Sequence, residues 1–324
     1  MNRQQHSAGL LKRAWSAVRD AAAEVRRLLL RREYWNVGVI DAPVHSLLDD
    51  RTPNIRWLDP PAKGTYRADP FAIRRGDDCF ILYERFDDLS YTGSVWGARL
   101  ENHGGDAPPT LRDARRALEL PGHAAYPCLL EHEGEIYCIP ETAVAREVVL
   151  FRAVEPPHRW QKAAVLIKNA AAVDATVFEY GGRWWLFHTD FDSDCNRDLF
   201  VWYADSLTGP WRPHEGNPVK SDAGSARPAG RPFVHEGRLY RPAQDCLKVY
   251  GRRVVINHVT KLDTAEFAEH PVAWVEPDAA GPCADGLHTI CGAGDITLVD
   301  GKRYRFIGAA ALGKIRKAFR RKSV

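Results

Sequence analysis

A pattern of two short strands joined by a glycine turn occurs five times along this chain of 324 residues. Each copy has an apolar strand, a turn ending in Gly and a second strand rich in aromatic residues. The copies span residues 68–84, 126–141, 173–190, 229–245 and 293–306, and their turn glycines are Gly76, Gly134, Gly182, Gly237 and Gly301. The glycines are 58, 48, 55 and 64 residues apart, slightly more than the roughly 40–50 residues of a typical propeller blade.

The segments between the copies have room for two further strands each. Four strands per unit and five units predict an all-β protein, a five-bladed β-propeller, in which radial repetition protects the sheet edges. The abundance of Trp, Tyr and Phe beside one Met, 25 Gly and 21 Pro favours short strands and turns in the same way. We expect residues 35–41 to supply the strand that closes the ring, and a short helical stretch around Leu111–Leu118 to decorate the first blade.

Charge divides the chain into three parts. Residues 1–33 hold eight Lys and Arg against three acids, residues 311–324 hold six basic residues and no acid, and residues 34–310 form the acidic body of the propeller. Apolar residues recur at helical spacing in both ends, which predicts basic amphipathic helices. Such helices bind anionic membrane surfaces; the alternative is a helix docked on its own domain or a solvated tail.

Several classes of function are not indicated by any motif. The acidic body and the absence of helix-turn-helix or zinc-finger spacing argue against nucleic-acid binding. The seven Cys include no C-x-x-C pair and the twelve His include no H-E-x-x-H, so we expect reduced thiols and assign no metal and no cofactor. Without a phosphate-binding glycine loop, we do not expect a self-contained nucleotide-using enzyme. Without a membrane span or a secretion signal, we expect a cytoplasmic protein, peripheral to the membrane where its ends bind lipid.

Carboxylates stand at equivalent positions of the repeats. Asp69 begins the first copy and Asp174 the third, so both are expected at one mouth of the central channel. The second strands also end in acids, namely Glu84, Glu141, Asp190 and Asp245. Either these acids cap turns and pair with neighbouring arginines, or several of them converge on one site.

Three phrases resemble the five-bladed glycosidase superfamily that contains arabinanases, xylosidases, invertases and levansucrases: ADPF at 68–71, VDATVFEYGGRWWLF at 173–187 and WYADSLTGPW at 202–211. A closer resemblance is to the domain that precedes the transferase domain of plant glucosamine inositolphosphorylceramide transferases. It covers about residues 35–308, with specific phrases at 123–142, 226–246 and 286–289.

The glycosidase resemblance implies a set of three carboxylates. Asp69 would be the general base or nucleophile, and Asp174 would orient the substrate and tune the proton donor. The position of the superfamily's acidic proton donor reads SARPAGRPF here and holds no carboxylate. Glu141 or Asp245 would replace it only if their side chains reach the same mouth.

Arginines suggest an anionic ligand. Arg227 and Arg231 begin the inner strand of the fourth blade and Arg241 follows in the second strand, which predicts a guanidinium cluster suited to a phosphorylated or acidic sugar. The alternative is that these arginines neutralise the nearby carboxylates. The polar residues expected to complete the rim are His123, Tyr126, Gln244 and His288, and Asp245 is a further candidate for substrate binding.

The sequence therefore supports two main hypotheses. The first is a carbohydrate-active protein with glycosidase-like or transfer chemistry on a cell-surface glycan or glycolipid. The second is a non-catalytic recognition module that helps a glycosyltransferase partner to hold an acidic or phosphorylated sugar. A scaffold that binds other proteins has only fold analogy in its favour.

Overall fold

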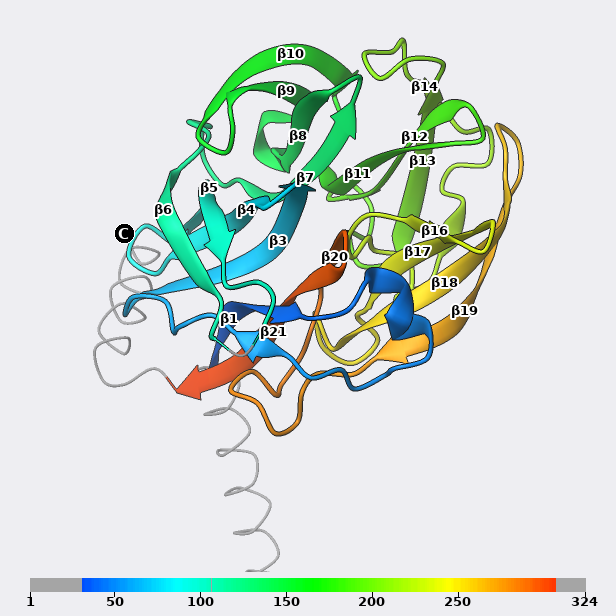
Figure 1. The fold of residues 1–324 in the computed structure, drawn as a ribbon. Helices are drawn as coiled ribbons and strands as arrows, with labels where there is room; N and C mark the ends of the chain where they lie inside the picture. Colours follow the sequence, from blue (N-terminus) through cyan, green and yellow to red (C-terminus); the bar gives the residue numbers. More distant parts are fainter. Residues whose placement is uncertain (1–30, 106, 307–324) are drawn as a thin grey trace, which may run out of the picture. The chain divides into compact units, whose positions relative to one another are not determined.

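The computed structural model describes residues 31–105 and 107–306. Trp35–Arg303 form one compact unit, in which five antiparallel sheets are the blades of a propeller (Figure 1). The first strands of the blades, β3, β7, β11, β16 and β20, lie nearest the centre. The predicted five-bladed, all-β architecture is confirmed.

Each of the first four blades is continuous in sequence. The first contains β3 (Thr65–Arg75), β4 (Asp78–Asp87), β5 (Thr92–Glu101) and β6 (Thr110–Arg116). The second contains β7 (Ala125–His132), β8 (Glu135–Glu141), β9 (Glu147–Glu155) and β10 (Arg159–Lys168). The third contains β11 (Ala172–Tyr180), β12 (Arg183–Asp190), β13 (Asp198–Ala204) and β14 (Arg212–Pro213), and β15 (Lys220–Ser221) also pairs with β13. The fourth contains β16 (Phe233–His235), β17 (Arg238–Asp245), β18 (Arg253–Leu262) and β19 (Phe267–Val275).

The fifth blade joins the two ends of the propeller sequence. Its order is β2 (Arg56–Trp57), β1 (Arg31–Ile40), β21 (Ile296–Phe306) and β20 (Ile290–Ala293). The segment predicted to close the ring, residues 35–41, lies almost entirely within β1. Pairing between β1 and β21 therefore joins the two ends of the propeller sequence in one sheet and closes the ring.

Two predicted details are wrong. The stretch around Leu111–Leu118 is largely the edge strand β6, which pairs with β5, and the short helices of the described residues are η1 (Val44–Leu48) and η2 (Ala143–Ala145). The last hairpin turns at Gly294 and Asp295, because Ala293 pairs with Ile296, so Gly301 lies inside β21. The sequence DGKRY around Gly301 has the composition of a turn, but pairing within the sheet outweighs that local preference.

The inner strands of three blades share one irregularity. Asp69, Tyr126 and Asp174 have φ angles of 51°, 41° and 53°, in the left-handed region. At each of them the strand register shifts, so that two residues face one on the second strand. Such a bulge re-aims a side chain, and a non-glycine residue in this conformation costs about 1–3 kcal/mol. The same strained bulge in three blades indicates a common site.

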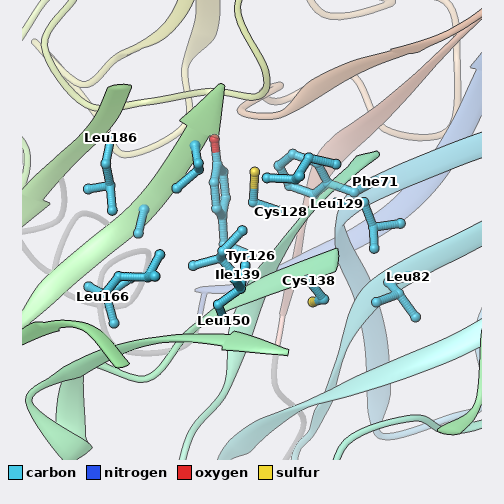
Figure 2. Close-up of a cluster of buried hydrophobic side chains, with 14 of the residues drawn as sticks. Phe71, Leu82, Tyr126, Cys128, Leu129, Cys138, Ile139, Leu150, Leu166 and Leu186 are labelled. Atoms are coloured by element: carbon cyan, nitrogen blue, oxygen red, sulfur yellow. The ribbon is translucent and has the colours of Figure 1, made fainter. Parts of the chain in front are cut away.

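Apolar side chains between the blades hold the inner strands in place. Figure 2 shows the cluster around the first three blades, including Phe71, Leu129, Ile139 and Leu150, which are almost completely buried. Tyr126 lies in the same cluster with its hydroxyl pointing away from Ile139 and Leu150. The buried framework fixes the strand ends that carry the carboxylates.

The predicted terminal helices, in residues 1–33 and 311–324, fall almost entirely outside the described residues. Within the described residues, no helix has the length and apolar character needed to cross a membrane.

Candidate functional site: an axial carboxylate cluster

Asp69 lies at the centre of a network that joins the fifth, first and second blades. Its Oδ1 accepts a hydrogen bond from Thr289 Oγ1 at 2.9 Å and lies 3.4 Å from His288 Nε2. Its Oδ2 accepts the backbone N–H of Tyr126 at 3.3 Å. Burial, partly offset by His288, raises the pKa of Asp69 to about 6. Asp69 is thus placed to exchange a proton near neutral pH.

Asp300 organises the fifth-blade side of this network. Its Oδ1 accepts the backbone N–H groups of His288 and Thr289, each at 3.0 Å, and its Oδ2 accepts that of Asp69 at 3.0 Å. His288 Nδ1 lies 2.6 Å from Asp300 Oδ2. Burial lowers the pKa of His288, but Asp300 and Asp69 outweigh that effect, and the pKa is raised. His288 therefore lies between two carboxyl groups, and its ring packs against Trp35 in a tilted arrangement, with centroids 4.0 Å apart.

Asp174 forms the opposite side of the cluster. Arg227 Nε donates to Asp174 Oδ2 at 2.6 Å, and Gln244 Nε2 donates to the same oxygen at 2.9 Å. The Arg227 guanidinium also lies over the Tyr250 ring, 4.9 Å from its centroid. Two donors on one oxygen fix the orientation of the Asp174 carboxyl group.

Glu141 and Glu84 complete the set of buried carboxyls. Glu141 Oε2 accepts the backbone N–H of Asp174 at 3.2 Å. Burial and the neighbouring Asp174 raise the pKa of Glu141 to about 8. Burial, together with the other carboxyls of the cluster, also raises the pKa of Glu84 well above its usual value. Glu141 is therefore mostly a neutral acid at pH 7, and the same two causes favour the protonated form of Glu84.

His123 and Tyr126 lie at the second-blade side. His123 is partly exposed; its Nε2 is 3.8 Å from Glu84 Oε1, and its Nδ1 accepts the backbone N–H of Gly93. The Tyr126 hydroxyl bonds to Thr176 Oγ1 at 2.9 Å and accepts the Gly230 N–H at 2.6 Å. Because the Tyr126 phenol is buried and occupied by these contacts, it supports the site and does not form its rim.

Two predicted substrate-binding residues, Asp245 and Arg231, lie elsewhere. Asp245 pairs with Arg252 and Arg253 at 3.0 and 2.8 Å. Neighbouring residues of a strand face opposite sides, so Asp245 points away from the side of β17 on which Gln244 contacts Asp174. Arg231 donates to the backbone oxygens of Ala72, Leu129 and Gly292 and borders a cavity of about 380 Å³.

Arg241, the third member of the predicted guanidinium cluster, pairs with the buried Glu269 at 2.6 Å. Of these three arginines, only Arg227 pairs with a carboxylate of the axial cluster, so the predicted cluster of guanidinium groups does not form.

Asp69, His288 and Asp300 are the one set among the described residues whose ligand atoms, all within 4.8 Å of one another, could hold a metal ion. Their nitrogen and oxygen atoms already approach each other directly. The pairing of an imidazole with two carboxyls therefore accounts for the arrangement of these three groups.

The family model described as "Glucosamine inositolphosphorylceramide transferase 1, N-terminal" matches residues 59–281, well over half of the chain. The chain belongs to this family. The matched region runs from just before β3 to just after β19, so this N-terminal family shares the first four blades.

Curated relatives agree with this assignment to the glucosamine inositolphosphorylceramide transferase 1 N-terminal family. The chain is 37% identical over 221 residues to glucosamine inositolphosphorylceramide transferase 1 of Oryza sativa subsp. japonica, covering 65% of this chain and 29% of the rice protein. It is 32% identical over 209 residues to the Arabidopsis thaliana protein of the same name, covering 63% of this chain and 27% of that protein. The match thus spans less than a third of the length of these relatives.

Solved glycoside hydrolases share the fold. An exo-β-1,3-galactanase from Phanerochaete chrysosporium has a TM-score of 0.53 at 13% identity, covering 72% of this chain and 56% of that one. Zg3597, a family 117 glycoside hydrolase from Zobellia galactanivorans, has a TM-score of 0.50 at 17% identity, covering 74% and 85%. This chain therefore has the propeller fold of these glycoside hydrolases, and together with its family it is a carbohydrate-related propeller protein.

Asp300 and Thr289 are site residues that the sequence did not indicate. The repeat pattern was aligned at Gly301, which placed the last hairpin seven residues too late. Aligned at Gly294, Asp300 falls six residues after the turn, close to the seven of Glu141 after Gly134 and the eight of Glu84 after Gly76. The signal was therefore present in the repeat.

Proposed function

We propose that this propeller is an enzyme that performs glycosidase-like or transfer chemistry on a glycan or glycolipid at the axial carboxylate cluster. The observation that carries the proposal is the gathering of carboxyl groups with different proton affinities in one network. The pKa of Asp69 is raised to about 6 and that of Glu141 to about 8, in both cases mainly by burial. Cleavage of a glycosidic bond requires one ionised and one protonated carboxyl.

Each carboxyl has a role that follows from its contacts. At pH 7 Asp69 is mostly ionised, and Thr289 and the Tyr126 N–H hold its oxygens in place. It either takes a proton from an attacking water or attacks the sugar carbon itself. Asp174, fixed by Arg227 and Gln244, orients the sugar. A neutral glutamic acid of the cluster gives its proton to the leaving oxygen as the C–O bond breaks; Glu141 is the sequence-based candidate.

A second candidate function is a recognition module without catalysis, and Arg227 favours it. This arginine occupies the segment where the glycosidase resemblance places the acidic proton donor, and it is paired with Asp174. A guanidinium in that position suits a phosphate or carboxylate on the sugar. The curated relatives are named as transferases and are more than three times the length of the match, which supports a glycosyltransferase as the partner of such a module.

The site of action forms part of the same proposal. A glycan or glycolipid substrate at the cytoplasmic face of a membrane would be consistent with basic chain ends that contact anionic lipid. Removing the basic residues of 311–324 by substitution should then reduce binding to vesicles that contain phosphatidylserine, without changing activity on a soluble glycan.

The test compares Asp69→Asn with wild type on furanosides, acidic oligosaccharides and inositol-phosphate glycolipids. Loss of a general base or nucleophile is expected to lower turnover by roughly 10²–10⁴-fold or more, while sugar affinity stays within a few fold. Asp205→Asn is the matched control, because Asp205 is exposed and lies at an outer turn.

Two other outcomes have definite meanings. Turnover unchanged in Asp69→Asn would contradict the assignment of the cluster as the active site. Binding of an anionic sugar with no turnover, weakened by Arg227→Gln and by salt, would replace the enzyme with the recognition module.

A further inference from the structure

The acids on the second strands have a regular structural partner in two blades. Asp300 on β21 accepts the backbone N–H of Asp69, which lies on the first strand of the next blade, at 3.0 Å. Glu141 on β8 accepts the backbone N–H of Asp174, again the left-handed residue of the next blade, at 3.2 Å. These two acids therefore satisfy the backbone of the adjacent bulge and hold neighbouring blades together.

Glu84 occupies the equivalent position in the first blade but lacks this partner. Glu84 pairs in register with Ala68, the residue before the left-handed Asp69, just as Glu141 pairs with Ala125, the residue before Tyr126. By the same rule Glu84 should accept the Tyr126 N–H, but that group donates to Asp69 Oδ2. Glu84 Oε1 is buried and has no hydrogen-bond partner among the described residues. A buried polar atom without a partner is costly.

The lack of a side chain at Gly93 leaves room for the Glu84 carboxyl group. A Cβ atom at Gly93 would lie 2.1 Å from Glu84 Oε1 and 2.8 Å from His123 Cε1, so a side chain at this position would overlap both groups. The Gly93 N–H donates to His123 Nδ1 at 2.9 Å. His123 therefore carries its proton on Nε2, the atom that faces Glu84 at 3.8 Å. On the solvent side of Glu84 stands a neutral imidazole held in one orientation.

Resting on the enzymatic function proposed above, we propose that Glu84 is the proton donor of the cluster, and that Glu141 is a positioning residue that holds Asp174. Glu84 has an oxygen that no structural hydrogen bond uses, whereas the Glu141 carboxyl is engaged by the Asp174 backbone. The Glu84 proton passes to the leaving-group oxygen as the C–O bond breaks with its electron pair on that oxygen. Water at the mouth then returns a proton to the Glu84 carboxylate.

The charges that face Glu84 favour its protonated form. Asp69, Glu141, Asp300 and Asp174 raise its pKa further after burial, the largest cause. Burial lowers the pKa of His123, the imidazole that lies 3.8 Å from Glu84, so this ring is uncharged at neutral pH. No positive charge of His123 then draws the proton from Glu84, and activity should fall as the pH rises through the pKa of Glu84.

The test compares Glu84→Gln with Glu141→Gln in the full chain. Each is assayed on a nitrophenyl glycoside, whose leaving group needs no protonation, and on an unactivated oligosaccharide of the same sugar. Glu84→Gln should lower turnover of the oligosaccharide roughly 10²–10⁴-fold and turnover of the nitrophenyl substrate far less. The decline of activity at alkaline pH should also disappear in this variant. Glu141→Gln should lose similar activity on both. His132→Gln is the control, because His132 lies 3.8 Å from Glu133, an exposed glutamate outside the carboxylate cluster.

A second measurement needs no turnover. NMR of ¹³C-carboxyl-labelled Glu, assigned through Glu84→Gln, should show Glu84 titrating well above the usual range of a glutamate. Titration near that usual range would overturn the proposal, as would leaving-group dependence in Glu141→Gln and not in Glu84→Gln. Absence of turnover on every probe would overturn the enzymatic function and the donor role with it, whereas a normal Glu84 titration with retained turnover would overturn the donor role alone.

Discussion

Burial governs the protonation of individual carboxyls in the cluster, and this links the site to the stability of the fold. The folded state raises the pKa of Glu141 from 4.5 to about 8. Between these values the folded protein binds a proton that the unfolded chain has released. Folding stability is therefore expected to fall as the pH rises through this window, by at most about 1.4 kcal/mol per pH unit for one such group.

The variant Glu141→Gln isolates this effect. Glutamine mimics the neutral acid and retains an oxygen to accept the Asp174 N–H, so the decline in unfolding free energy between pH 5 and pH 8 should become shallower than in wild type. Urea unfolding at a series of pH values measures it. Glu133→Gln, at an exposed turn, should leave the slope unchanged; an equal slope in Glu141→Gln and wild type would mean that Glu141 titrates normally.

Gly93 is the second residue whose identity the packing dictates. An added Cβ would lie 2.9 Å from the backbone oxygen of Ala124, as well as 2.1 Å from Glu84 Oε1. Gly93→Ala should destabilise the fold by about 1–3 kcal/mol, although alanine is otherwise favoured over glycine inside a strand. Guanidinium unfolding checks this value. Gly104→Ala, where no atom lies within 4 Å of the new Cβ, should be neutral or slightly stabilising.

At the scale of strands and hairpins, the repeat in the sequence predicted the architecture because each hairpin is a local structure. The turns at Gly76, Gly134, Gly182 and Gly237 are all where the glycines predicted them, with positive φ angles. The last hairpin was misplaced because its second strand contains DGKRY, which imitates a turn, and β6 was misread as a helix because its exposed polar residues lack alternation. In both cases pairing with a neighbouring strand decides the conformation, and a local sequence does not report its neighbours.

The candidate site was predictable to the extent that strand ends determine it. Six of the predicted site residues do converge, because equivalent ends of inner and second strands meet at one mouth. They are Asp69, Asp174, Glu141, Arg227, Gln244 and His288. Asp245 and Arg231 do not, because their placement depends on the facing of single residues in β17 and near β16. The diversion of the Tyr126 N–H to Asp69, which leaves Glu84 without a partner, depends on contacts between blades that no pattern in the sequence reports.

At the scale of the whole propeller, one side chain connects most of the blades. Arg231 enters the central channel from the fourth blade and donates to Ala72 of β3, Leu129 of β7 and Gly292 of β20. It thereby bonds to the inner strands of the first, second and fifth blades. Only a guanidinium has donors on three nitrogens spread in a plane, so it can reach several carbonyls at once. The bonds act across the ring and should make its opening more cooperative.

Arg231→Met should therefore destabilise the whole propeller. Removing the guanidinium leaves three backbone oxygens near the axis without their donor, at about 1–3 kcal/mol for each one that water does not reach. Arg231→Lys should recover part of the loss, because a single ammonium cannot replace all three bonds. Urea unfolding followed by Trp fluorescence measures both, with Arg238→Met, at the exposed first residue of β17 in the same blade, as control. Wild-type stability in Arg231→Met, together with reduced affinity for an anionic sugar, would return Arg231 to the ligand-binding role first expected from its sequence position.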